Sequence, residues 1–170
     1  MRAGLASQTL PAYARRMFRR LVARLGHRRW FSAIGSGLLP RLDRAVYRAS
    51  GHRWMVATIA FPTLMLHDGG HKPVPLLYAR DGKDYLVAAT NWGRPQHPAW
   101  SRRLLAGQPA TVELHGRVTP VLARHLSPTE VAAAWPRLVA VWPAFDTYRQ
   151  RAEREIRVFR LSPAGDPTVP

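Results

Sequence analysis

The fold is decided by residues 74–90, which read VPLLYARDGKDYLVAAT. Two apolar runs flank the polar tetrapeptide Arg80-Asp81-Gly82-Lys83 in the middle of this stretch. An Asp-Gly pair readily takes the positive φ angles of a tight turn between antiparallel strands. The pattern therefore predicts a β-hairpin with strands at 74–79 and 85–90.

Further short elements are predicted on both sides of this hairpin. Strands are expected at 63–66, 110–114, 118–126 and 155–161, with Gly116 in the turn of a second hairpin. Helices are expected at 98–105 and from the capping box Ser127-Pro128-Thr129-Glu130 to about Val141, just before Pro143. Short antiparallel strands combined with a few helices indicate an α+β fold built on a small barrel.

The N-terminal region has a different character. Residues 10–30 have the periodicity of an amphipathic helix, and residues 38–49 predict a second helix that ends before Gly51. We therefore expect a basic helical leader at 1–50, a barrel domain at 51–163 and a loose Pro-rich tail at 164–170.

The charge of the chain is strongly basic and uneven. Lysine and arginine number 26 against 10 acidic residues, giving a net charge of +16, and nine arginines precede the first acid, Asp43. Such a surface attracts anions. The leader either packs on its own barrel, binds anionic lipid or binds nucleic acid. We favour lipid because arginines flank Met17, Phe18 and Leu21, and no nucleic-acid-binding motif is present.

Several classes of protein are excluded or disfavoured. The chain has no cysteine, which excludes disulfides, zinc–thiolate sites and Cys nucleophiles. No apolar run is long enough for a spanning helix, so we expect a cytoplasmic protein that the leader attaches peripherally to the inner face of the membrane. His67, Asp68 and His71 have a spacing that suits a metal, but their side chains need not converge, and we expect no metal site.

Residues 74–163 resemble the deazaflavin-dependent nitroreductase family. The resemblance rests on marks in a fixed order: Pro75-Leu76, Asp81-Gly82, Val87-Ala88-Ala89-Thr90 with Gly93, His97-Pro98-Ala99-Trp100, Glu130, Trp135-Pro136-Arg137-Leu138, Pro143 with Phe145 and Tyr148, and Arg154-Glu155-Ile156.

The resemblance implies a split β-barrel of the flavin-reductase and pyridoxamine-oxidase type, often in a homodimer. It also implies an oxidoreductase that takes hydride from the reduced deazaflavin coenzyme F-420. The acceptors in this family are hydrophobic and electron-poor, such as quinones and nitroaromatics. FMN is the less favoured cofactor.

The resemblance also assigns roles to residues. Those expected to bind the coenzyme are Lys72, Val74, Pro75, Leu76, Ala88, Ala89, Thr90, Asn91, Gly93, His97, Pro98, Trp100 and Arg103. The acceptor is expected at Trp142, Phe145 and Tyr148, with Tyr148 as the proton donor. Because aromatic side chains dominate protein cores, Trp100, Trp142 and Phe145 have a structural role as the alternative.

Two departures from the family pattern leave a second function open. The turn at 68–72 is short and has few cations, and Arg103 stands where the family has asparagine. The alternative is a non-catalytic barrel that binds FMN, haem or a lipid-like ligand in the same groove.

Overall fold

The computed structural model describes residue 45, residues 61–69 and residues 72–165 of the 170-residue chain. Most of the predicted leader, the first ten residues of the predicted barrel domain and residues 166–170 of the tail lie outside this part. The division into leader, barrel domain and tail therefore stays a prediction.

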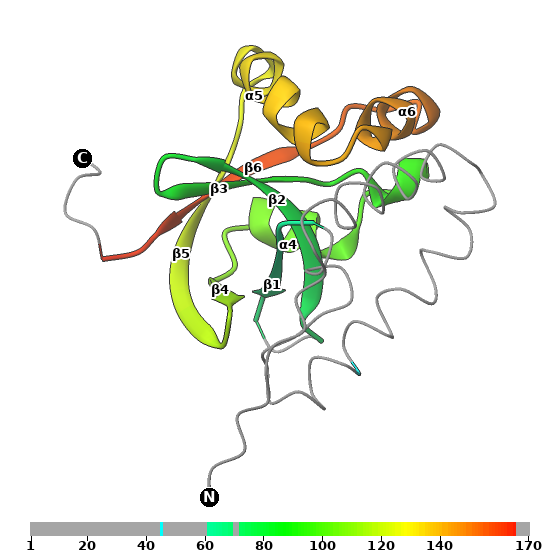
Figure 1. Ribbon diagram of the computed structural model, residues 1–170. Coiled ribbons are helices and arrows are strands. Elements are labelled where there is room, and N and C mark those ends of the chain that lie inside the picture. Colours follow the sequence, from blue (N-terminus) through cyan, green and yellow to red (C-terminus); the bar gives the residue numbers. More distant parts are fainter. Residues whose placement is uncertain (1–44, 46–60, 70–71, 166–170) are drawn as a thin grey trace, which may run out of the picture.

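Six antiparallel strands form a closed barrel in the order β1-β2-β3-β6-β5-β4 (Figure 1). The strands are β1 (Thr63–His67), β2 (Val74–Asp81), β3 (Asp84–Ala88), β4 (Ala110–Leu114), β5 (Arg117–His125) and β6 (Val158–Pro163). The barrel closes because β1 pairs with both β2 and β4. Closure satisfies the hydrogen-bonding groups that an open sheet would expose at its edges.

Both predicted hairpins are confirmed. In the first, Asp81 pairs with Asp84 across a turn in which Gly82 has a φ of 60°. In the second, His115 and Gly116 have φ angles of 51° and 80°. Two successive positive φ angles give a turn whose twist matches that of the flanking strands.

The two helices predicted within the barrel domain are present as α4 (Ala99–Leu105) and α5 (Pro128–Val141). A further helix, α6 (Ala144–Arg151), follows Pro143, and α5 and α6 lie together on one side of the barrel (Figure 1). The capping box forms as expected, because the Glu130 carboxylate accepts a hydrogen bond from the Ser127 N–H at 2.9 Å. Arg124 and then Ser127 lower the pKa of Glu130 to about 2.

Two apolar cores hold these layers together, and β3 contributes to both. Tyr85 and Val87 point into the barrel, whereas Leu86 points out to a second cluster beneath α5 and α6. This alternation follows from the two-residue period of a strand. Burial of Leu86, which has no exposed surface, contributes about 1.5–3 kcal/mol.

Several strand boundaries differ from the sequence prediction, and two of the differences shorten a strand by two or more residues. The strand predicted to extend to Thr90 ends at Ala88, and the last strand begins at Val158 rather than Glu155. Extended structure cannot continue past Ala88 because the chain enters three residues with positive φ at Asn91. Before β6, Glu153 also has a positive φ of 52°, which delays the extended conformation.

The barrel with its packed helices confirms the predicted α+β class. Within the part of the chain that the structure describes, no helix combines the length and the apolar character needed to span a bilayer.

Candidate functional site

One end of the barrel gathers the main stretches that the family resemblance assigned to the coenzyme. Tyr78 of β2 lies opposite Val87 of β3, and Ala88 lies opposite Val158 of β6. Because these pairings are antiparallel, residues 74–76, the end of β3 and the start of β6 lie at the same end. The chain that leaves β3 then runs along α6 (Figure 1).

The segment after β3 has an unusual backbone. Asn91, Trp92 and Gly93 form the short helix η1 (Asn91–Gly93), and their φ angles are 49°, 60° and 78°. Residues other than glycine rarely adopt this left-handed region, and such strain clusters at functional sites. Hydrogen bonds within the loop fix it, including Asn91 Nδ2 to the Gln96 carbonyl at 2.8 Å and the Gly93 N–H to the Thr90 carbonyl at 3.0 Å.

Gly93 lets η1 lie directly against α6. A Cβ atom at this position would be 3.1 Å from the Cβ of Arg151 and 3.2 Å from the Cα of Tyr148. These distances are shorter than ordinary carbon–carbon contacts. The absence of a side chain at Gly93 therefore sets how closely η1 approaches α6.

The predicted acceptor residues lie beside this segment. The ring centroids of Trp92 and Tyr148 are 6.0 Å apart, and that of Phe145 is 6.4 Å from Tyr148. Trp142 packs edge-on against Phe61 at 5.0 Å. Trp142, Phe145 and Tyr148 are only 4%, 5% and 2% exposed, so they form part of the core beneath α5 and α6.

His97 lies in cationic surroundings. Its Nδ1 atom is 3.1 Å from Nη1 of Arg154. A guanidinium can only donate, so Nδ1 accepts and a neutral His97 carries its proton on Nε2. Burial lowers the pKa of His97, and Arg154, Arg157 and Arg102 lower it further against the opposing effect of Glu155. The imidazole is therefore neutral at pH 7.

Positive charge is in excess around this histidine. Burial, and next the charge of Arg157, lower the pKa of Arg154. Within the described residues, Nη1 of Arg157 is buried and has no hydrogen-bond partner. An excess of cations suits an anionic ligand. The coenzyme F-420 carries a phosphate and a polyglutamate tail, which are both negatively charged. The positive charge at this end of the barrel is complementary to them.

The other residues predicted to bind the coenzyme lie in varied settings. Lys72 is exposed just before β2, and Pro98 caps α4. Trp100 is 5% exposed inside the barrel, where its ring is 5.9 Å from that of Phe159. Arg103 donates from Nε and Nη2 to one carboxylate oxygen of Asp68, whose side chain has no exposed surface.

The ion pair of Arg103 with Asp68 also concerns the residues whose spacing suits a metal, which are His67, Asp68 and His71. Asp68 is engaged by Arg103, and Nε2 of His67 lies 2.9 Å from a carboxylate oxygen of Glu113. His71 lies outside the described residues, among which no group of three or more potential metal ligands occurs.

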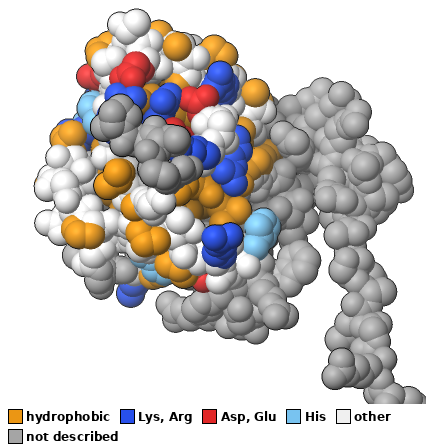
Figure 2. All heavy atoms as spheres, turned by 90° about the vertical axis from the view of Figure 1, so that its left-hand side faces the viewer, with side chains coloured by type: hydrophobic (Ala, Val, Ile, Leu, Met, Phe, Trp, Pro, Cys, Tyr) orange, Lys and Arg blue, Asp and Glu red, His pale blue; other side chains and the backbone are white. Residues whose placement is uncertain are grey.

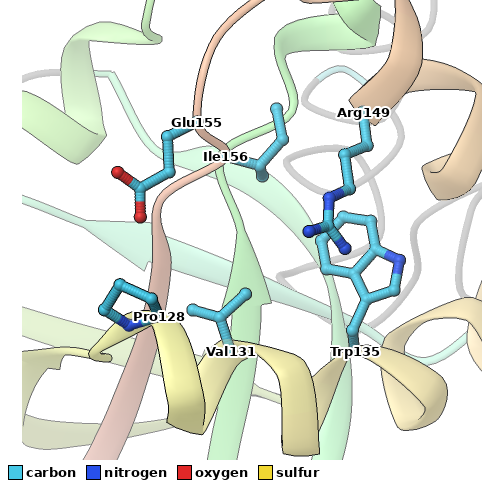
Figure 3. A pocket seen from close by; sticks show the side chains of 6 residues that line it. All are labelled: Pro128, Val131, Trp135, Arg149, Glu155 and Ile156. Carbon is cyan, nitrogen blue, oxygen red and sulfur yellow. The ribbon is translucent and has the colours of Figure 1, made fainter.

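A separate pocket of about 310 Å³ lies between α5, α6 and residues 155–156. Figure 3 shows the guanidinium of Arg149 beside the ring of Trp135, with the Glu155 carboxylate on the other side of the opening. Arg149 lies 5.0 Å from that ring, a cation–π distance. The residues predicted to bind coenzyme and acceptor do not line this pocket.

Sequence reasoning assigned no role to Arg154, Arg157 or Trp92. Arg154 was part of a family mark, but its contacts with residues 89–97 depend on the closure of the barrel. The local signal for Arg154 is its place immediately before the strand predicted at 155–161.

Comparison with known proteins identifies the family. The family described as F-420H(2)-dependent quinone reductase matches residues 39–163. An F-420H(2)-dependent quinone reductase of Mycobacterium tuberculosis is 29% identical over 151 residues, which cover 79% of this chain and 96% of that protein. A second M. tuberculosis protein, named for the same activity, is 33% identical over 107 residues, covering 60% of this chain and 90% of the relative.

Solved structures agree. The structure of an F-420-H2 dependent reductase superimposes with a TM-score of 0.55 and 26% identity, covering 59% of this chain and 94% of that one. Another solved chain, described as a domain-swapped dimer, also has a TM-score of 0.55 and 26% identity, and 80% of it is covered. The matches support the split-barrel fold. The chain belongs to the F-420H(2)-dependent quinone reductase family of oxidoreductases, whose coenzyme is the deazaflavin F-420.

Proposed function

We propose that this chain transfers hydride from reduced coenzyme F-420 to a hydrophobic, electron-poor acceptor of the quinone type. The observation that carries the proposal is the left-handed segment at 91–93, which lies at the end of β3 between cationic side chains and an aromatic cluster. The family match spans the whole of this arrangement.

The coenzyme supplies the redox chemistry. When bound, the reduced deazaflavin provides a hydride, and with one further proton a quinone becomes a hydroquinone, so two electrons and two hydrogens pass to the acceptor. The protein holds and orients the reactants. In the proposal, Thr90 contacts the ring system with its hydroxyl, Asn91 and Gly93 give the loop the shape that receives the ring, and Arg157 and Lys72 attract the acidic tail.

The acceptor is proposed to bind at Trp142, Phe145 and Tyr148. The Tyr148–Trp92 contact joins this aromatic cluster to the coenzyme segment. Two of the three side chains lack a phenolic hydroxyl, which favours flat apolar acceptors over nitro groups that need a hydrogen bond. Tyr148 is the one member of the three that carries a hydroxyl, and it is the proposed proton donor.

Titration of the full-length protein tests the proposal. We expect saturable binding of F-420, detected by a change in deazaflavin fluorescence, and reduction of menadione when reduced F-420 is supplied. FMN and haem are titrated in parallel. Stoichiometric FMN in the isolated protein, together with an absence of F-420 binding, would instead support the non-catalytic alternative.

Membrane attachment through the leader is a further part of the proposal. Its support is the sequence, in which nine arginines precede the first acid. Binding to vesicles that contain anionic lipid should exceed binding to neutral vesicles and should weaken with added salt, because salt screens exposed charges. Equal binding to both kinds of vesicle would contradict the electrostatic explanation.

A homodimer is also proposed, and β5 offers a surface for it. Val118 and Leu122 on the outer face of this strand are 55% and 60% exposed. The barrel side viewed in Figure 2 shows hydrophobic side chains exposed among polar ones. Light scattering of the wild type and of Leu122→Ser measures the oligomeric state, and a wild-type monomer would exclude this interface.

A further inference from the structure

The Arg154 side chain makes six polar contacts with other residues of the described part of the chain. Its guanidinium donates to five carbonyl oxygens and to one imidazole nitrogen. The carbonyls belong to Ala89 (3.1 Å), Thr90 (3.3 Å), Arg94 (3.3 Å), Gln96 (3.3 Å) and Glu155 (3.1 Å), and the imidazole is that of His97 (3.1 Å). None of these six acceptors is a carboxylate oxygen.

These contacts join the two limbs of one loop. Ala89 and Thr90 lie where the chain leaves β3, whereas Gln96 and His97 lie where it approaches α4. Nη2 alone bridges both limbs, because it donates to the carbonyls of Ala89, Thr90 and Gln96. Residues 91–93 are the strained turn between the limbs.

The side chain at this position must be arginine for a geometric reason. A guanidinium has five N–H donors in a rigid plane and can serve acceptors on several sides at once. A lysine ammonium has three donors on a single atom and cannot span both limbs in the same way. Binding carbonyl oxygens on several sides therefore requires the planar set of guanidinium donors as well as the positive charge.

We infer that Arg154 is a positioning residue, which holds residues 89–97 in the shape that receives the coenzyme. The inference rests on the proposed function, because the loop matters for catalysis only if the coenzyme binds there. Arg154 itself acts through the backbone it holds, because its guanidinium donates to the protein's own carbonyls and to His97. The site is therefore shaped by a residue that lies 65 positions from Ala89 in the sequence.

The loop would lose its support without this side chain. Left-handed conformations at Asn91 and Trp92 are unfavourable for residues with a Cβ atom and persist only when their surroundings impose them. The remaining support includes the contact of Gly93 with α6 and one side-chain bond between the turn and the second limb, from Asn91 Nδ2 to the Gln96 carbonyl. That single neutral bond would replace the three carbonyls that Nη2 of Arg154 holds together.

The test compares Arg154→Ala and Arg154→Lys with Arg137→Ala as a matched control. Arg137 is an exposed arginine whose guanidinium pairs with Asp81 at the far end of the first hairpin. Its loss changes the net charge equally and removes an ion pair without touching residues 89–97. Three quantities are measured: F-420 affinity, amide hydrogen exchange by segment, and the concentration of urea at half-unfolding.

We expect F-420 to bind about 10-fold more weakly or worse to Arg154→Ala, the loss typical for hydrogen bonds from a charged group. Exchange should increase in residues 89–97 while β1, β4 and β5 keep their protection. Methylguanidinium, which restores the planar donor set, should recover part of the affinity of Arg154→Ala and have no effect on Arg137→Ala. Arg154→Lys should keep the charge yet still show faster exchange in residues 94–97.

Two results would overturn the inference. One is an affinity in Arg154→Lys and Arg154→Ala within about 2-fold of the wild type, a difference too small for a lost charged hydrogen bond. The other is a general loss of protection across the barrel, which would mark Arg154 as an ordinary stabilising residue. If Arg154→Ala does not fold, Arg154→Lys still decides between these outcomes. Failure of the wild type to bind F-420 would instead refute the proposed function. The hydrogen-exchange data would still test whether Arg154 holds residues 89–97 in place.

Discussion

Replacing Gly93 with alanine tests how far contact with α6 shapes residues 89–97, the proposed coenzyme segment. At a φ of 78°, a residue with a Cβ atom costs roughly 1–2 kcal/mol relative to glycine. The new methyl group would also lie 3.1 Å from the Cβ of Arg151 and 3.2 Å from the Cα of Tyr148. The helix backbone cannot rotate away as a side chain can, so overpacking adds about 1–3 kcal/mol. The total loss in free energy of unfolding should be about 2–5 kcal/mol.

Gly107 provides a matched control. Its φ is 73°, close to that of Gly93, and a Cβ atom there would meet no atom within 4 Å. Gly107→Ala should therefore suffer only the conformational cost of about 1–2 kcal/mol. The difference between the two variants isolates the contact between η1 and α6.

Urea unfolding of both variants measures the two free energies, and titration with F-420 measures the effect on the site. We expect Gly93→Ala to be the less stable variant by about 1–3 kcal/mol and the only one with weakened coenzyme binding. Equal stability losses and unchanged affinities in both would refute the reasoning, because they would mean that the contact with α6 neither strains nor shapes the loop.

Three further outcomes are expected. Arg103→Ala should lower the free energy of unfolding by about 3–5 kcal/mol, because the fully buried Asp68 carboxylate loses its cation; a loss below about 1 kcal/mol would contradict this. The folded chain holds the pKa of His97 below 6.5, so the unfolded chain binds a proton first and stability falls as the pH drops through 6.5; His97→Gln should lack this part of the pH slope in urea unfolding. Steady-state assays should show faster reduction of menadione than of a nitroimidazole, and Phe145→Ala should raise the KM for menadione; unchanged kinetics with lower thermal stability would make Phe145 purely a core residue.

Much of the fold could be predicted because its signals are local. The first hairpin depends on Asp81-Gly82, and α5 depends on a capping box whose members are three residues apart. Each of these features forms from neighbours in the chain. The strand ends at Ala88 and Val158 follow from positive φ angles in the adjoining loops, which the preferences of single residues do not predict.

The site was less accessible to sequence reasoning because several predicted residues have partners far along the chain. No partner for Arg103 is evident from the sequence, which is why it is predicted to bind the coenzyme. In the structure it pairs with Asp68, which lies 35 positions earlier. Trp100 suggested a flat face for a ring, and the structure packs it inside the barrel. Charge and aromatic character can be read from a sequence, but whether they are already engaged depends on the tertiary fold.

These partners also explain how the site tolerates the departures from the family pattern. Arg103 can replace the asparagine of the family because its guanidinium binds Asp68 of the protein itself. The coenzyme segment depends instead on backbone shape, for which Gly93 and Arg154 are responsible. Backbone N–H groups are the same for every sequence, so a loop held in this shape can keep its affinity for the coenzyme while the surrounding side chains change. Divergence within the family should therefore alter the acceptor sooner than the coenzyme.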